Sequence, residues 1–400
     1  MRTGTPGFRP SRLRLAREAR GLTQVGLAEL VGRSSQSVSR WENDEHEQSP
    51  EPDALQALAA ALNVPVSGLL GAEPHQSQHL FFFRSMSSAT KSLRSRMSAK
   101  MQWQQEISGV LQDHLDFPAV HVPQLSVTSH RQLSDQRIEE AAGEVRSLWG
   151  LGSGPIGDLL LVLENAGIIV SVVAAATDKL DGLSNWNDRD NRPYILLSAD
   201  IPVTVRQRMD AAHELGHLVL HRHVKTTELN SPADFKEIER QAFLFASAFL
   251  MPAETFSSEV WSPSLASFLS LKERWRVSVG AMVMRARTLD LISSEYASRL
   301  WKHISAKGWR KGEPLDDKLP LERPRVLSRG VTMLVEEGGF TKSDVIELMR
   351  LRERDIEELC GLQKGYLSSS NNVVGMVALK PEAKRVMGAL PSTVVPFRRR

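Results

Sequence analysis

Short amphipathic segments follow one another closely over about the first 70 residues of the chain. Hydrophobic residues recur there every three or four positions, which is the spacing of a helix with one buried face. Gly21 closes the first segment, Thr23 can cap the second, and serines open the third. The pattern therefore predicts five short helices, at residues 11–21, 22–32, 33–43, 52–62 and 66–70.

The middle of the chain mixes helical periodicity with short apolar runs. The pattern predicts helices at residues 132–148 and 157–164 and strands at residues 168–173 and 194–198. Polar residues 178–192 predict a loop between the strands. The longest apolar stretch, residues 159–176, is interrupted by Glu164 and Gly167, which indicates a helix, a glycine stop and a strand and not a membrane span.

An H-E-x-x-H motif lies in the next helical run. On a helix, His213 and His217 are one turn apart on the same face, so both imidazoles can bind one metal ion. Glu214 projects beside them and can take a proton from a water molecule there. The surrounding residues are apolar, so two imidazoles and a carboxylate would be costly to bury without a shared partner. The motif predicts a zinc hydrolase.

A third protein ligand is needed, and the acidic side chains of residues 235–252 are the nearest downstream candidates. This segment has helical periodicity and ends at Pro252. Glu239 lies on the flank of its apolar face, while Glu237 lies on nearly the opposite side, so at most one of the two faces the site. The spacing alone leaves both open, and either could be a surface charge.

Together, the H-E-x-x-H helix and the segment Glu239-Arg-Gln-Ala-Phe-Leu-Phe-Ala-Ser-Ala-Phe-Leu-Met-Pro252 resemble the ImmA/IrrE family of metallopeptidases. The resemblance implies a zincin-like domain of the gluzincin type, with His213, His217 and Glu239 as Zn²⁺ ligands and Glu214 as the general base. The chain departs from the family at Phe243, where the family usually has Asn or Asp. This departure affects the surroundings of the ligands and leaves the ligands themselves in place.

Two further side chains near the motif have open roles. His221 is two turns after His213, so it either supports a ligand from behind or packs and binds water. Tyr194, on a predicted strand, either polarises a substrate carbonyl or packs in the interior.

The N-terminal helices carry an independent signal. The pattern Leu22-Thr23-Gln24-x-x-Leu27-Ala28 followed by Ser37-Val38-Ser39-Arg40-Trp41-Glu42 resembles the XRE, or Cro/C1-type, helix-turn-helix family, which places its second helix in the major groove of DNA. The alternative is a helical protein-interaction module. The resemblance implies that backbone phosphates are contacted by Gln24, Arg40 and Asn43. It implies that base edges are contacted by Ser35, Gln36 and Ser39.

Composition limits the remaining options. The chain has 400 residues, 50 basic against 47 acidic, so its net charge is only +3 and affinity for DNA must be local. Its one cysteine, Cys360, excludes a disulfide framework and a cysteine zinc site and agrees with a reducing cytoplasm. The sequence opens without a signal peptide, so we expect a soluble cytoplasmic protein that does not bind membranes.

We therefore expect an α+β, mainly α protein with a five-helix Cro/C1-like domain, a zincin-like metallopeptidase domain with a small sheet, and a helical C-terminal extension. Residues 80–115, basic at their start, are interpreted as a helix docked on the peptidase domain and alternatively as a segment that follows phosphates. Two helices within residues 265–292 are interpreted as scaffold. The expected divisions are 8–71 for the helix-turn-helix domain, 72–130 for a hinge and connecting helix, 131–300 for the peptidase domain and 301–400 for the extension, whose role the sequence does not give.

The combined prediction is a sequence-specific transcriptional regulator that carries a zinc endopeptidase. We expect the peptidase to cleave a partner repressor or the chain itself. The first alternative is a transcription factor whose peptidase-like domain does not cleave and senses metal, a ligand or a partner. A second alternative is a plain metallopeptidase that uses its N-terminal domain only to dimerise. Double-stranded DNA and a protein substrate are the expected partners. The sequence leaves a homodimer open, and it gives neither the operator, the scissile bond nor the activating signal.

Overall fold

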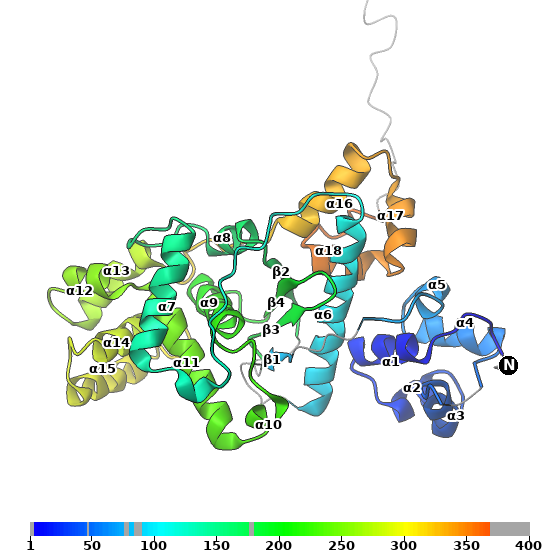
Figure 1. Ribbon diagram of the computed structural model, residues 1–400, viewed down its shortest axis with the longest axis horizontal. Coiled ribbons are helices and arrows are strands. Elements are labelled where there is room, and N and C mark those ends of the chain that lie inside the picture. Colours follow the sequence, from blue (N-terminus) through cyan, green and yellow to red (C-terminus); the bar gives the residue numbers. More distant parts are fainter. Residues whose placement is uncertain (1–3, 46–47, 76–79, 84–89, 176–179, 369–400) are drawn as a thin grey trace, which may run out of the picture.

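The computed structural model describes residues 4–45, 48–75, 80–83, 90–175 and 180–368. The part of the chain so described is mainly helical, with one small sheet near its centre and helices on both sides (Figure 1). Parts of the predicted hinge and loop (76–79, 178–179) and the end of the extension, residues 369–400, lie outside the described residues. The α+β, mainly α fold class is confirmed.

Five helices form the N-terminal domain, as the pattern predicted. Thr23 caps the second helix by accepting a hydrogen bond from the backbone N–H of Gly26, and Ser34 caps the third by accepting one from Ser37. Gly21 has φ of +67°, a left-handed conformation that suits glycine at the end of the first helix. The helices are α1 (Pro10–Ala19), α2 (Gln24–Leu30), α3 (Ser35–Trp41), α4 (Pro52–Ala61) and α5 (Val66–Leu69).

The sheet has four strands in the order β1-β3-β4-β2. Strands β2 and β4 are parallel, whereas β3 runs antiparallel to both β4 and β1. The strands are β1 (Phe82–Phe83), β2 (Ile169–Val173), β3 (Gly182–Asn187) and β4 (Arg192–Ser198). The predicted loop 178–192 was therefore wrong over β3. A half-exposed strand alternates polar and apolar residues, with the polar ones facing solvent. Strand β3 does not follow this pattern, because all of its residues are buried, including the polar ones.

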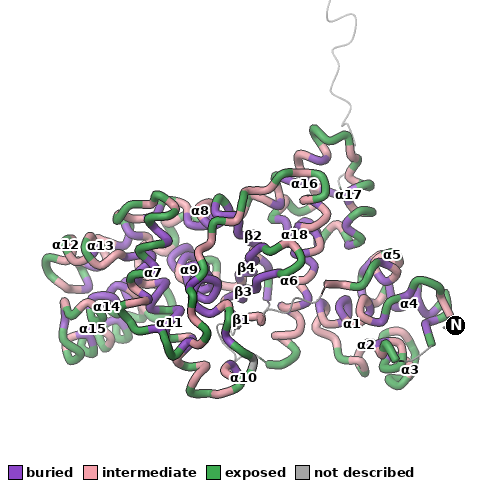
Figure 2. Tube along the Cα trace, viewed as in Figure 1, coloured by how far each residue is buried: buried purple, intermediate pink, exposed green. Residues whose placement is uncertain are grey.

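Both faces of the sheet are buried. Along β4, Ile195 and Leu197 belong to the hydrophobic cluster that includes α9 (Thr204–Leu220), and Tyr194 and Leu196 belong to the cluster on the other face. Alternate residues of a strand point to opposite faces, so the continuous apolar run of β4 reflects cover on both sides. Figure 2 shows this burial along α9 and the strands.

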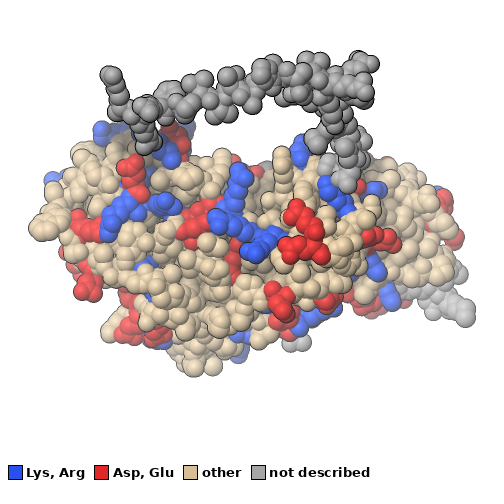
Figure 3. Space-filling view, turned by 90° about the horizontal axis from the view of Figure 1, so that it is seen from above, with Lys and Arg blue, Asp and Glu red and all other residues tan. Residues whose placement is uncertain are grey.

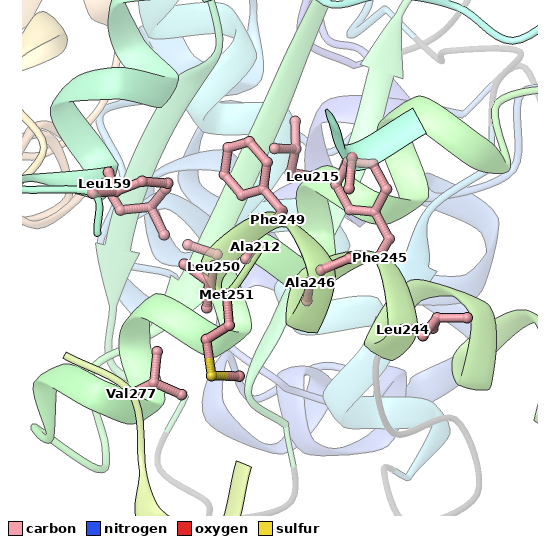
Figure 4. Packing of buried hydrophobic residues seen from close by; sticks show 14 of the residues in the cluster. Leu159, Ala212, Leu215, Leu244, Phe245, Ala246, Phe249, Leu250, Met251 and Val277 are labelled. Carbon is pink, nitrogen blue, oxygen red and sulfur yellow. The ribbon is translucent and has the colours of Figure 1, made fainter. Parts of the chain in front are cut away.

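Helix α11 (Pro232–Leu250) packs against α9 and against α7 (Asp135–Leu148). Gly216 permits the close approach, since a Cβ there would lie 3.1 Å from the backbone oxygen of Ala242. The rings of Phe245 and Phe249 stack with centroids 5.9 Å apart and belong to the same hydrophobic cluster as Leu215 of α9 (Figure 4). The close packing of Ala242 and Phe245 against Gly216 fixes α11 beside the H-E-x-x-H helix.

Further elements surround this centre. Helix α8 (Leu159–Asn165) leads through Gly167, at φ of +84°, into β2, which confirms the predicted helix, glycine stop and strand. No helix among the described residues is both long and apolar enough to span a membrane. The remaining elements are a 3-10 turn (His130–Gln132), α10 (Thr226–Leu229), α12 (Ala253–Glu259), α13 (Leu265–Trp275), α14 (Val279–Thr288) and α15 (Ser294–Ala306).

Helix α6 (Lys91–Gln112) connects the N-terminal domain with the rest of the molecule. It contacts α1 on one side and β4 on the other, together with three helices of the C-terminal extension, α16 (Val326–Glu336), α17 (Lys342–Met349) and α18 (Glu353–Cys360). The expected helix docked on the peptidase domain is thus present as α6, and residues 84–89 of the predicted segment lie outside the described residues. The prediction was wrong at residues 82–83, which form β1.

Candidate metal centre and DNA-binding face

Helix α9 places both histidines and the glutamate of the motif in the interior. The Nε2 atoms of His213 and His217 face each other at 3.0 Å. His213, Glu214 and His217 have no exposed surface. The helix is buried along its whole length because it lies between the sheet and α11.

Helix α11 brings Glu239 to the same point. Its Oε2 lies 3.4 Å from His213 Nε2, and its Oε1 lies 3.2 Å from His217 Nε2. Glu237, the competing acid, instead accepts hydrogen bonds from Arg240 and turns away from the imidazoles. The structure therefore brings together the residues that the family resemblance implied.

The donor set fits a zinc ion. One ligand atom from each of His213, His217 and Glu239 can be chosen so that all lie within 4.8 Å of one another. Two imidazole nitrogens and one carboxylate oxygen are a common ligand set for catalytic zinc, which keeps a fourth position open. Burial lowers the pKa of His217 to about 3, so its imidazole is neutral near pH 7 and has a lone pair to donate.

Glu214 is held by the neighbouring strand. Ser184 of β3 donates a hydrogen bond from its hydroxyl to Glu214 Oε2 at 2.6 Å. At Gly182 of the same strand, a Cβ would come within 3.2 Å of Glu214 Oε1. Strand β3 thus orients the carboxylate and leaves it room beside the histidines.

A chain of hydrogen bonds runs from His217 away from the donor set. His217 Nδ1 lies 3.0 Å from His221 Nδ1, and His221 Nε2 lies 3.0 Å from Gln241 Oε1. The Gln241 Nε2 donates to the backbone oxygen of His130 at 2.9 Å, which fixes the orientation of the amide. His221 is therefore the group that supports a candidate ligand from behind, one of the two roles that the sequence left open.

This chain assigns the tautomers. An amide oxygen only accepts, so His221 carries its proton on Nε2, and its Nδ1 accepts a hydrogen bond from the N–H at His217 Nδ1. The lone pair of His217 then lies on Nε2, the atom that faces His213 and Glu239. This is the tautomer that a metal ligand at that position requires.

Two aromatic rings cover the imidazoles. The ring of Phe243 lies against His213 with centroids 4.4 Å apart, and Phe82 stacks on His217 at 4.9 Å with an angle of 11° between the planes. Phe243 thus places a ring where the family usually has a polar side chain. Tyr194 does not take part, because it is fully buried and donates its hydroxyl to Asp190 on the other face of the sheet.

The N-terminal domain presents α3 to solvent. The residues expected to face bases, Ser35, Gln36 and Ser39, are exposed, as is Arg40. Gln24 and Asn43 are half-buried: Gln24 donates to Glu42 at 2.8 Å, and Asn43 accepts from the backbone N–H of Glu45 at 2.9 Å. The six residues remain candidates for DNA contact, with α3 as the exposed recognition surface.

Sequence reasoning missed several residues of the metal centre. Ser184 lies in a strand that was interpreted as a loop, and Phe82 lies in a segment interpreted as part of a helix. Gln241 and His130 support the centre through hydrogen bonds to residues distant in sequence, so no local sequence pattern indicates their role. A polar residue within an otherwise buried strand was the available signal for Ser184.

Two family comparisons agree with these sites. Residues 163–287, which include β2 to β4 and all the candidate metal ligands, match the family described as IrrE N-terminal-like domain. Residues 13–69 match the family described as Helix-turn-helix. A search of curated proteins found no match. The chain therefore joins an XRE-type helix-turn-helix domain to a peptidase-family domain of the IrrE/ImmA-like type.

Proposed function

We propose that this protein is a cytoplasmic transcriptional regulator with a zinc-dependent endopeptidase domain. The observation that carries the proposal is the convergence of His213, His217 and Glu239 beside the carboxylate of Glu214. The exposed α3 of the helix-turn-helix domain supports binding to double-stranded DNA. An operator with two half-sites would favour a homodimer.

The residues of the site have separate roles in peptide hydrolysis. Zinc bound by the three ligands would polarise a peptide carbonyl and make water a stronger nucleophile near neutral pH. Glu214 takes the proton from the attacking water and gives it to the leaving amine. Ser184 holds this carboxylate in place. Strand β3, whose outer edge pairs with β1 in the structure, would offer backbone groups to an extended peptide that took the place of β1.

We propose a repressor protein as the substrate. This assignment rests on the presence of a DNA-binding domain in the same chain and on the resemblance to peptidases that remove repressors. Cleavage of such a protein would derepress the genes that it controls. The alternative substrate is the chain itself.

Zinc content and cleavage of co-expressed repressors test the enzymatic part. We expect one zinc per chain in the wild type and in Glu214→Gln, with cleavage only in the wild type, because the base is lost and the ligands remain. Glu239→Gln should lose zinc, whereas Glu237→Gln, whose carboxylate pairs with Arg240 and is not among the candidate ligands, should keep it. Zinc retained in Glu239→Gln would contradict the ligand assignment.

The non-enzymatic sensor remains the alternative function. The complete burial of His213, Glu214 and His217 and the ring of Phe243 against His213 favour it. It predicts zinc without cleavage in both the wild type and Glu214→Gln.

DNA binding is tested by two substitutions on α3. Arg40→Ala should weaken binding to all sequences and reduce the dependence of log K on log salt by about one unit, since it removes a phosphate contact. Gln36→Ala should instead relax the preference at one base pair, at a cost of about 1–3 kcal/mol. Titrations of operator and random DNA at several salt concentrations measure both. Wild-type protein without any salt-dependent binding would favour a domain that only dimerises.

A further inference from the structure

The candidate peptidase site is closed to solvent. His213, Glu214 and His217 have no exposed surface, and the side chain of Glu239 is only 12% exposed. An endopeptidase has to admit a polypeptide to these groups. A substrate can therefore reach them only if some part of the chain that covers them moves.

Strand β1 lies at the edge of the sheet that borders the site. It pairs antiparallel with β3, with Phe82 opposite Ser184 and Phe83 opposite Leu183. Because Ser184 holds Glu214, β1 runs along the sheet edge beside this carboxylate. The side chain of Asn185 also donates to the backbone oxygen of Leu80 at 3.1 Å, which fixes the start of the segment.

The side chain of Phe82 fills an apolar pocket beside the donor set. Residues opposite each other on paired strands point to the same face, so Phe82 and Ser184 both face α9. The Phe82 ring stacks on His217, lies 6.2 Å from His221 and is 5% exposed. The pocket that receives it is formed by Val224, Leu229 and Ile238, with Phe235 at its border, and Leu80 of the same segment packs there as well.

We propose that residues 80–83 are an intramolecular occupant of the peptide-binding edge and keep the site closed. The inference rests on the proposed function and adds to it the class of substrate. A substrate has to bind as an extended strand along β3 and place an aromatic or large apolar side chain in the pocket of Phe82. It has to displace the chain's own segment first.

Two further observations concern the place of this segment in the chain. Residues 80–83 lie outside both segments that match known families. They also lie between α5 and α6, so the segment is tethered at both ends. A short tether gives an effective concentration in the range of about 1 mM, and a free peptide has to compete with it.

The test compares Phe82→Ala with Phe81→Ala, both in the Glu214→Gln background to prevent cleavage. Phe81 is the matched control, because its ring packs against the hydrophobic cluster on the other face of the sheet. The probe is a fluorescein-labelled synthetic peptide with a Leu-Phe-Phe-Phe core, and anisotropy measures its binding. Phe82→Leu serves as a milder variant, and circular dichroism confirms that each variant is folded.

We expect the peptide to bind Phe82→Ala at least tenfold more tightly than it binds the parent or Phe81→Ala, with Phe82→Leu between them. A probe with alanine at the position of Phe82 should lose this preference. Equal binding to all variants, or no binding to any, would overturn the inference. Zinc content of the same samples reports separately on the proposed function: selective peptide binding without zinc would support the occupant and contradict the peptidase.

Discussion

At the scale of the residue, His221 is the side chain whose role sequence reasoning left most open. Its Nδ1 accepts a hydrogen bond from His217 Nδ1, and its Nε2 donates one to Gln241, so Gln241 fixes the orientation of His221. Removal of this partner frees the His217 ring to rotate and to adopt the other tautomer. Partners of this kind typically contribute a factor of about 10–100 to metal affinity.

We therefore predict that His221→Ala lowers zinc affinity by about 10- to 100-fold. Competition with a chromophoric chelator measures the change without reference to activity. His223→Ala is the control, since His223 is exposed and contacts Gln124 and not the candidate ligands. An unchanged affinity in His221→Ala would show that packing alone orients His217.

The spacing of a motif locates residues on one helix and says little about what faces them. His213, Glu214 and His217 could be placed together from the sequence because a helix repeats at a fixed interval. Glu239 needed the family resemblance, since spacing alone left Glu237 as a competitor. Gln241 could not be assigned, because its role depends on how α11 is rotated against α9.

At the scale of the element, β3 shows why polar strands escape a sequence interpretation. Ser184 and Asn185 are buried, and both are satisfied by side-chain hydrogen bonds. These residues make the strand resemble a loop in composition, although every position is covered. The predicted strands β2 and β4 were found because their apolar side chains are used only for packing.

Helix α16 depends on a carboxylate from another helix. Its first residues lack a side-chain cap, and Glu164 of α8 accepts hydrogen bonds from the backbone N–H groups of Arg325 and Val326. Burial nevertheless raises the pKa of Glu164 to about 7. Between about pH 4.5 and pH 7, Glu164 thus keeps its proton in the folded protein, whereas in the unfolded chain it has already released it.

The contribution of Glu164 to the free energy of unfolding should accordingly be greatest below about pH 4.5. It should fall as the pH rises to about 7, by about 3 kcal/mol at most. Urea unfolding of the wild type and Glu164→Gln at pH 5 and pH 7.5 measures this contribution as a difference. The advantage of the wild type over the variant should shrink at the higher pH. An advantage that grows with pH would mean that the backbone donors keep the carboxylate ionised.

At the scale of the whole molecule, the helix-turn-helix domain is docked onto α6 and the C-terminal extension. Arg20, at the C-terminal end of α1, makes two hydrogen bonds of 2.6 Å to Asp355 of α18 and lies over the ring of Trp103. Arg12 pairs with Glu106 at 2.8 Å. On the outer face seen in Figure 3, basic and acidic residues are interspersed and neither sign gathers into one large patch.

Breaking the pair of Arg20 and Asp355 should loosen this docking. Each single alanine variant leaves a largely buried charge without its partner, so we expect a loss of about 3 kcal/mol for each. The double variant should lose less than the sum, with a coupling of about 1–2 kcal/mol in urea unfolding. The exposed pair of Arg33 and Asp53 is the control, and its coupling should stay below about 1 kcal/mol.

The sequence predicted the separate parts of this molecule better than their assembly. Both family patterns are local, and each predicted its own helices. The contact between Arg20 and Asp355 joins residues 335 positions apart, and no periodicity in either segment indicates it.

The docking of α1 leaves α3 exposed, so one surface of the small domain binds α6 while another remains available to DNA. A chain bound to an operator would therefore carry its peptidase-family domain to that locus at a fixed distance from the double helix. A repressor on a neighbouring site would meet it at a local concentration far above that in the cell. Under the proposed function, the position of the operator would then determine which repressor is cleaved. The peptide-binding edge would not need a high affinity for the substrate strand.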